Sequence, residues 1–172
     1  MRHVAAWHRS RSVAPARPTR TQWGTPQVSR DRLSGVVTGA RPAGVYRWRS
    51  RAHPAAVGRE LAAVGWGWYV LDGRTITGPS PLFDRCAEVL AFPAWFGRDF
   101  DALAHCLGDL SWLPGRGHVL LWEAWGMLAG QDPRTWRLAY QVFAGAAAGR
   151  PATAPPLYLL LRGDGPAEIP LL

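Results

Sequence analysis

The run Val-Leu-Leu-Trp at residues 119–122 is apolar at every position, so it has no polar face to turn toward water. A strand of this kind must be covered on both sides, which is typical of a parallel sheet between helical layers. Similar short runs occupy residues 68–71 (Trp-Tyr-Val-Leu) and 157–161 (Leu-Tyr-Leu-Leu-Leu). The first of these ends at the Asp72-Gly73 turn. The three runs predict three buried strands.

Segments with helical periodicity separate these runs. Prolines predict helices that begin near Pro54, at Ser80-Pro81 and at Asp132-Pro133. Each helix has one apolar face, formed in turn by Val57, Leu61 and Val64, by Leu82, Phe83, Cys86, Val89 and Leu90, and by Trp136, Ala139, Tyr140 and Phe143. Strands that alternate with helices predict an α/β fold with a small three-stranded parallel sheet and surrounding helices.

The N-terminal part of the chain predicts an addition to this sheet. Residues 45–48, Val-Tyr-Arg-Trp, alternate like a short edge strand, and the helix after Pro54 follows them. We therefore expect a strand and helix extension at residues 39–66 and a main domain at residues 67–163. The pattern leaves open whether the extension joins the sheet. Residues 164–172, with their Gly and Pro, are predicted to form a flexible tail.

The positive charge of the chain is concentrated near its N-terminus. Residues 1–60 contain twelve Arg and two acidic residues, a net +10, whereas residues 61–172 contain eight Arg and ten acidic residues, a net −2. Residues 1–38 are rich in Arg, Ser, Thr and Pro without a sustained period, which predicts a basic disordered leader or a start assigned too far upstream. Nucleic acid is a possible partner only through this leader.

Several other classes are disfavoured. Cys86 and Cys106 fall on apolar helix faces without metal-ligand spacing, which indicates buried reduced thiols. No apolar run approaches the roughly 18 residues of a membrane span, and the N-terminus lacks the apolar core of a secretory signal. We expect a cytoplasmic protein that is monomeric when free and has no membrane contact, cofactor, metal or enzymatic activity.

The stretch from Phe92 to Leu110 is the main candidate for a functional site. It joins an aromatic loop to a short helix with two different faces. Phe100, Leu103, Cys106, Leu107 and Leu110 fall on one face, and Asp101, His105 and Asp109 fall on the other. Neighbouring His105 and Cys106 point about 100° apart, which disfavours a catalytic pair. Two carboxylates and one imidazole on a single exposed helix also make a poor metal site.

The acidic face has two interpretations. Asp99 is placed as the helix N-cap and Asp101 lies in the first turn, so a solvated helix surface explains both residues. The small residues Ala102, Ala104 and Gly108 instead favour close approach of a partner with a cationic pocket. Trp95 is either an exposed anchor for such a partner or a ring packed against the helix.

At these residues the chain resembles the barstar family, which comprises barstar, the intracellular protein inhibitor of the ribonuclease barnase, and the bacterial relatives of barstar. The resemblance spans roughly residues 68–162. Its most specific part is Phe-Pro-x-Trp-Phe-Gly-Arg-x-Phe-Asp-Ala-Leu-x-x-Cys-Leu at residues 92–107, supported by His-Val-Leu-Leu-Trp-Glu at residues 118–123. It implies a barstar-like three-stranded parallel sheet, here with a possible added N-terminal edge strand and helix.

The resemblance also implies a function, that of an inhibitor or antitoxin that occludes the active site of a ribonuclease or related toxin. An acidic helix is complementary to a phosphate-binding cleft lined with cations. The partner-binding residues expected here are Trp95, Gly97 at a turn, Asp99, Asp101, His105 and Asp109. The alternative is a barstar-fold interaction or regulatory module with a partner that is not a nuclease.

Three departures from the family pattern affect that expectation. His105 stands where the resemblance implies the most important acidic contact, and Gly145 stands near a second one. Arg98 places a cation beside the carboxylates. The resemblance therefore implies ribonuclease inhibition as a class and leaves the target open.

Overall fold

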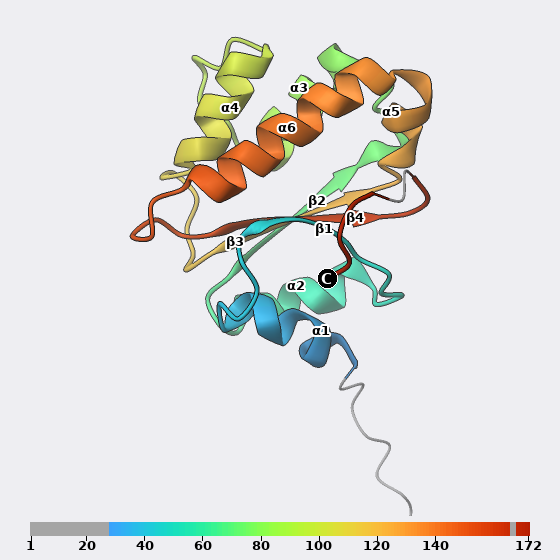
Figure 1. Cartoon of the computed structure of the whole chain (residues 1–172). Coiled ribbons are helices and arrows are strands. Elements are labelled where there is room, and N and C mark those ends of the chain that lie inside the picture. Colours follow the sequence, from blue (N-terminus) through green and yellow to red (C-terminus); the bar gives the residue numbers. More distant parts are fainter. Residues whose placement is uncertain (1–27, 166–167) are drawn as a thin grey trace, which may run out of the picture.

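A four-stranded parallel sheet forms the centre of the protein (Figure 1). The computed structural model describes residues 28–165 and 168–172, with side chains from residue 33 onward. The strands are β1 (Gly44–Arg47), β2 (Gly67–Asp72), β3 (His118–Glu123) and β4 (Leu157–Arg162), in the order β1-β4-β3-β2. The three predicted strands are present, and the N-terminal edge strand that the sequence left open is present as β1, so the sheet has four strands and not three. The N-terminal extension joins the sheet because β1 pairs in parallel with β4.

The two central strands are buried on both faces, as their sequences predict. In β3, Leu120 and Trp122 face one hydrophobic core, while Val119 and Leu121 face a second core on the other side. β4 alternates in the same way between these two cores. Successive side chains of a strand point to opposite faces, so a strand without polar positions requires both layers.

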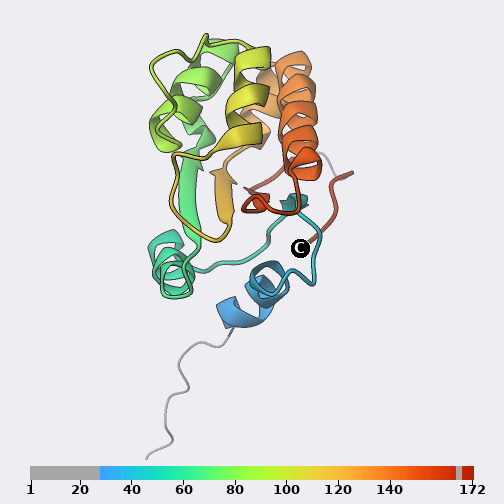
Figure 2. The same ribbon diagram turned by 90° about the vertical axis from the view of Figure 1, so that its left-hand side faces the viewer.

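Helices cover both faces of the sheet (Figures 1 and 2). On one side lie α1 (Val28–Val37) and α2 (Pro54–Ala62); on the other lie α3 (Pro79–Val89), α4 (Phe100–Asp109), α5 (Gly126–Gln131) and α6 (Pro133–Gly149). A short 3-10 helix, η1 (Gly73–Thr75), follows β2. α2, α3 and α6 each begin with proline in the first turn, as predicted. None of the helices in the described part of the chain is both long and apolar enough to cross a membrane.

Two helical features differ from the sequence prediction. The sequence predicts disorder through residue 38, whereas residues 28–37 form α1, whose Leu33 and Val36 are buried against the sheet. Burial in the second core, rather than the weak intrinsic pattern of this segment, stabilises the helix. Residues 1–27 of the predicted leader lie outside the described residues. Val64, predicted to face inward, is 45% exposed because α2 ends at Ala62.

The C-terminal segment is not a free tail. The Arg47 amide donates a hydrogen bond to the Pro170 carbonyl at 2.7 Å, and the Leu172 amide donates to the Arg47 carbonyl at 3.1 Å. Ile169 is buried in the core on the α6 side. The segment therefore covers the outer edge of β1, which would otherwise present unpaired backbone groups. The other edge is β2, where Trp68, Tyr69 and Val70 are only half-buried.

His118, the first residue of β3, is a buried polar group. Its side chain is fully buried, and neither ring nitrogen has a hydrogen-bond partner among the described residues. The ring packs against Tyr69, with 6.1 Å between ring centroids. Burial lowers the pKa of His118 to about 4, and the charge of Arg150 acts in the same direction. The folded protein therefore holds this imidazole in its neutral form.

We predict that His118 makes the protein sensitive to acid. Its pKa is about 6.5 in the unfolded chain and about 4 in the folded one, so the unfolded state binds the extra proton between these values. Stability is complete above pH 6.5 and falls by about 3 kcal/mol as the pH is lowered to 4. Urea unfolding from pH 7.5 to 4 measures this loss. His118→Phe removes the titrating group, so its stability should decline less over the same range. Equal declines would show that His118 is not the cause.

Candidate protein-binding surface

α4 has a buried face and an exposed face, as the sequence predicts. Leu103, Cys106 and Leu107 are fully buried, whereas Asp101 and His105 are exposed. The helix begins at the predicted N-cap, where the Asp99 carboxylate accepts a hydrogen bond from the Ala102 amide at 2.6 Å. Asp109 is also exposed, and its carboxylate accepts from the Ser111 amide at 3.3 Å. The exposed face therefore carries carboxylates on both sides of His105.

The sequence left open whether Trp95 is exposed or packed against the helix, and the structure shows both features. The Trp95 side chain is 57% exposed, yet its ring lies edge-on to the His105 ring, with centroids 5.5 Å apart and planes at 79°. The indole and the imidazole thus form one continuous exposed surface at the junction of the loop and α4. Such a surface provides aromatic contact area beside the carboxylates.

Aromatic packing holds the loop that carries Trp95. Phe92 contacts Phe96 and Trp112, with ring centroids 4.9 and 6.1 Å apart, and Phe83 of α3 contacts Phe96 at 6.3 Å. The Trp112 indole also donates a hydrogen bond to the Leu90 carbonyl at 2.9 Å. These rings are half-buried or buried against the main core, so the exposed Trp95 projects from a fixed support.

The bend before α4 lies at Arg98 rather than at Gly97, where the sequence predicts the turn. Arg98 adopts a left-handed conformation with φ of 55°, and Gly97 does not. A Cβ atom at Gly97 would lie 3.2 Å from an Asp99 carboxylate oxygen, so glycine at this position gives the N-cap room. The side chain of Arg98 pairs with Asp84 of α3, with Nε 3.2 Å from the carboxylate oxygen. The cation is therefore engaged by α3, although this exposed pair contributes only about 0–1 kcal/mol.

Arg150 holds the other end of α4. Its guanidinium donates to the carbonyls of Leu107, Gly108 and Asp109 at 2.8, 3.0 and 3.0 Å, and to the Pro155 carbonyl at 2.7 Å. The last carbonyls of a helix lack partners within the helix and favour a cation. Arg150 follows α6, so it ties the end of α4 to the segment that leads into β4. Sequence reasoning missed Arg150 and Asp84 because each lies far along the chain from its partner.

The two cysteines are free and buried, as the sequence predicts. Burial raises the pKa of Cys86 to about 12 and also raises the pKa of Cys106. Gly145 is exposed on α6 and offers no side chain to a partner. Among the described residues, no group of three or more His, Cys, Asp or Glu side chains could hold a metal ion.

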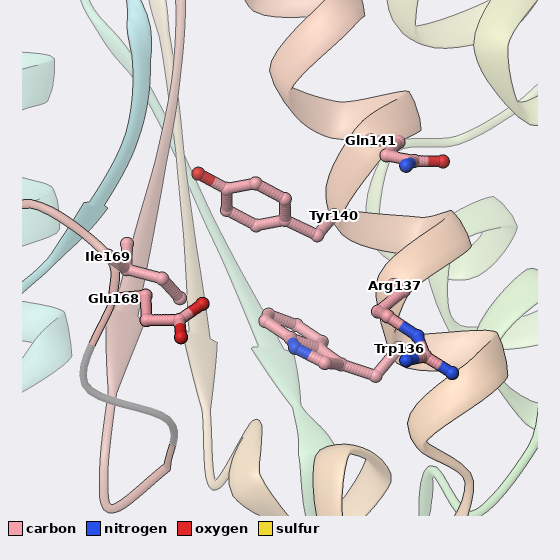
Figure 3. Close-up of a pocket in the computed structure, with 6 residues that line it drawn as sticks. All are labelled: Trp136, Arg137, Tyr140, Gln141, Glu168 and Ile169. Atoms are coloured by element: carbon pink, nitrogen blue, oxygen red, sulfur yellow. The ribbon is translucent and has the colours of Figure 1, made fainter.

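A separate cavity of about 290 Å³ lies between α6 and the C-terminal segment (Figure 3). Trp136 and Tyr140 point from α6 toward Glu168 and Ile169, while Arg137 points away from them. The cavity is open to solvent, and Glu168 is the only charged side chain that faces these rings in the view. It shares no residue with the α4 surface.

The fold and the surface together define an α/β protein that presents an acidic helix and an exposed aromatic residue on a fixed support. The family described as Barstar (barnase inhibitor) matches residues 67–161, which is 95 of the 172 residues. This protein therefore belongs to the barstar family. The description of that family is of an inhibitor and not of an enzyme. A comparison with curated proteins finds no match.

Solved structures with a similar fold include two of the ORC2 protein from Aeropyrum pernix. The ADP form is 10% identical with a TM-score of 0.57, covering 86% of this chain and 43% of that one. The ADPNP-ADP complexes are 10% identical with a TM-score of 0.55, covering 80% and 39%. The chain thus spans about two fifths of the length of these structures. At this identity the likeness concerns the α/β fold alone.

We predict that Arg150 is needed to hold α4 in place. Arg150→Met leaves four carbonyls without their shared donor and should lower the free energy of unfolding by about 2 to 4 kcal/mol. Arg150→Lys should recover only part of this, because an ammonium group cannot span the same set of acceptors. Arg98→Ala serves as a control that removes only an exposed ion pair, with a loss of about 1 kcal/mol or less. Urea unfolding measures all three. A loss for Arg150→Met no larger than that for Arg98→Ala would contradict the prediction.

Proposed function

We propose that this protein is a bacterial, cytoplasmic inhibitor or antitoxin that binds a ribonuclease or related toxin and occludes its active site with α4 and the preceding aromatic loop. It acts as a monomer and by occupancy, without turnover. One observation carries the proposal: on the exposed face of α4, the ring of His105 contacts Trp95, and Asp101 lies one helical turn before His105. The chain that carries this face belongs to the barnase-inhibitor family.

Charge supports this proposal. Asp101 and Asp109 lie on the exposed face of α4, and Asp99 lies at its start. A ribonuclease cleft must bind the phosphates of RNA with cationic groups, so carboxylates on a protruding helix are complementary to it. Arg98, which would oppose such a cleft, is paired with Asp84.

The rigidity of the surface also supports it. The N-cap at Asp99, the aromatic rings around Phe96 and the four hydrogen bonds of Arg150 fix α4 and its loop from three directions. A surface that is already ordered loses less entropy on binding than a mobile one. Tight inhibition by a short helix depends on the helix being ordered before it binds.

A second candidate function is an interaction module for a partner that is not a nuclease. His105 favours it, because the imidazole occupies the middle of the exposed face between Asp101 and Asp109 and contacts Trp95. A purely cationic cleft would place a cation opposite His105. A partner that is matched to an imidazole between two carboxylates would place a different group there. The variant His105→Asp separates the two candidates. It should bind a cationic cleft more tightly and a partner matched to imidazole more weakly.

We predict that the immobilised protein captures a ribonuclease from a lysate and that free protein inhibits it. Barnase is assayed in parallel as a defined probe, using cleavage of a fluorogenic RNA substrate. Asp101→Ala and Trp95→Ala should each raise the concentration needed for half inhibition at least tenfold, about 1.4 kcal/mol.

Asp164→Ala is the matched control, because it removes an exposed carboxylate outside α4 and its loop. Its inhibition should equal that of the unaltered protein. A captured ribonuclease that stays fully active with the protein in excess would contradict the inhibitor function. The inhibitor function would also be contradicted if the captured fraction had no ribonuclease activity and the protein did not inhibit barnase.

A further inference from the structure

The cavity between α6 and the C-terminal segment brings two aromatic rings and a carboxylate together (Figure 3). Trp136 and Tyr140 line it from α6, and Glu168 and Ile169 face them from the C-terminal segment. Residues four apart lie on the same face of a helix, so α6 presents both rings to one side. The ring centroids are 5.9 Å apart, and the ring planes are tilted by 50° to each other.

The walls of this cavity are fixed by contacts outside it. Trp136 is only 7% exposed, and its ring packs against that of Trp125, with centroids 4.7 Å apart. On the opposite side, Ile169 is buried, and the Arg47 amide donates a hydrogen bond to the Pro170 carbonyl at 2.7 Å. The cavity is therefore formed before a ligand enters, which lowers the entropic cost of binding.

The charges in the cavity favour a cation. Glu168 is exposed and makes no ion pair within the part of the chain that the structure describes. Arg137 also lines the cavity, but its side chain points away from the rings and from Glu168 (Figure 3). The face of an aromatic ring carries negative partial charge and attracts cations. Because the two rings are tilted, a cation away from the line where their planes meet is exposed to the face of at least one ring.

Two other cavities do not combine these features. The cavity between α1 and α2 is lined by Glu60, but none of its described lining residues is aromatic. The cavity beside Arg150 has neither an aromatic side chain nor a carboxylate among its described lining residues. The pairing of aromatic rings with an available carboxylate therefore distinguishes the cavity at α6 from both of them.

We propose that this cavity binds a small organic cation of the quaternary ammonium class between Trp136, Tyr140 and Glu168. A quaternary ammonium group has no N–H donors, so ring faces and a counter-charge are sufficient to hold it. An ammonium or guanidinium group would lose hydrogen bonds to water that apolar walls replace only in part. The volume of about 290 Å³ lies near the lower end of the range for ligand cavities, which matches a free small molecule. This site goes beyond the proposed inhibitor function.

The test measures the binding of choline to the full-length protein by isothermal titration calorimetry. The reference ligand is the neutral carbon analogue of choline, in which a carbon atom replaces the charged nitrogen. Choline should bind saturably in the millimolar range or tighter. The analogue has the same shape but no charge, so its affinity should be lower by about tenfold or more.

Variants then assign the binding to this cavity. Glu168→Gln keeps the size of the side chain and removes its charge, so choline binding should weaken severalfold. Tyr140→Leu removes a ring and should weaken it by about threefold or more, whereas Tyr140→Phe keeps the ring and should not. Asp164→Asn is the matched control, because Asp164 is an exposed carboxylate outside the cavity. Circular dichroism and urea unfolding check that each variant folds.

Several results would overturn the proposal. The absence of saturable binding at millimolar choline would do so, and equal affinity for choline and its analogue would show that charge is not recognised. Unchanged affinity in both Glu168→Gln and Tyr140→Leu would place choline elsewhere on the protein. Binding to phosphatidylcholine vesicles without binding of free choline would assign the cavity to a lipid surface. Asp101→Ala should leave choline binding unchanged, so this test is independent of the proposed inhibitor function.

Discussion

Burial of β3 and β4 on both faces is the constraint on which the rest of the structure depends. Neither strand has a polar face, so each requires a helical layer above and below the sheet. α3 to α6 supply one layer, and α1 and α2 supply the other. The added elements at residues 28–66 are thus part of the folded core, because they cover apolar surface such as Val119 and Leu121 that would otherwise meet water.

The same arrangement gives α4 its role. Its apolar face completes the core over the sheet, so its polar face has to point outward. Contacts at the two ends then fix where that face points. Asp99 caps the first turn, and Arg150 binds the last three carbonyls. A helix of ten residues is marginal by itself, so these tertiary contacts convert a short amphipathic segment into a rigid binding surface.

Sequence reasoning succeeded where a local pattern specifies the structure. The all-apolar runs predicted the central strands, the Asp-Pro pair predicted the start of α6, and helical spacing placed Asp101 and His105 outward. It failed where stability comes from distant contacts. α1 has a weak pattern of its own, and the C-terminal segment is ordered by hydrogen bonds to Arg47. The left-handed conformation of Arg98, where glycine would be expected, likewise has no local signal.

The sequence by itself determined the α/β class, the two faces of α4 and the family to which the chain belongs, because periodicity and motif spacing are local properties of the chain. Only the tertiary structure decided that the sheet has four strands, that Arg98 pairs with Asp84 and that Arg150 closes the end of α4. It also decided that α1 and α2 lie on the side of the sheet opposite α4. These features join residues that are distant along the chain, and the folded backbone alone brings such residues within reach of one another.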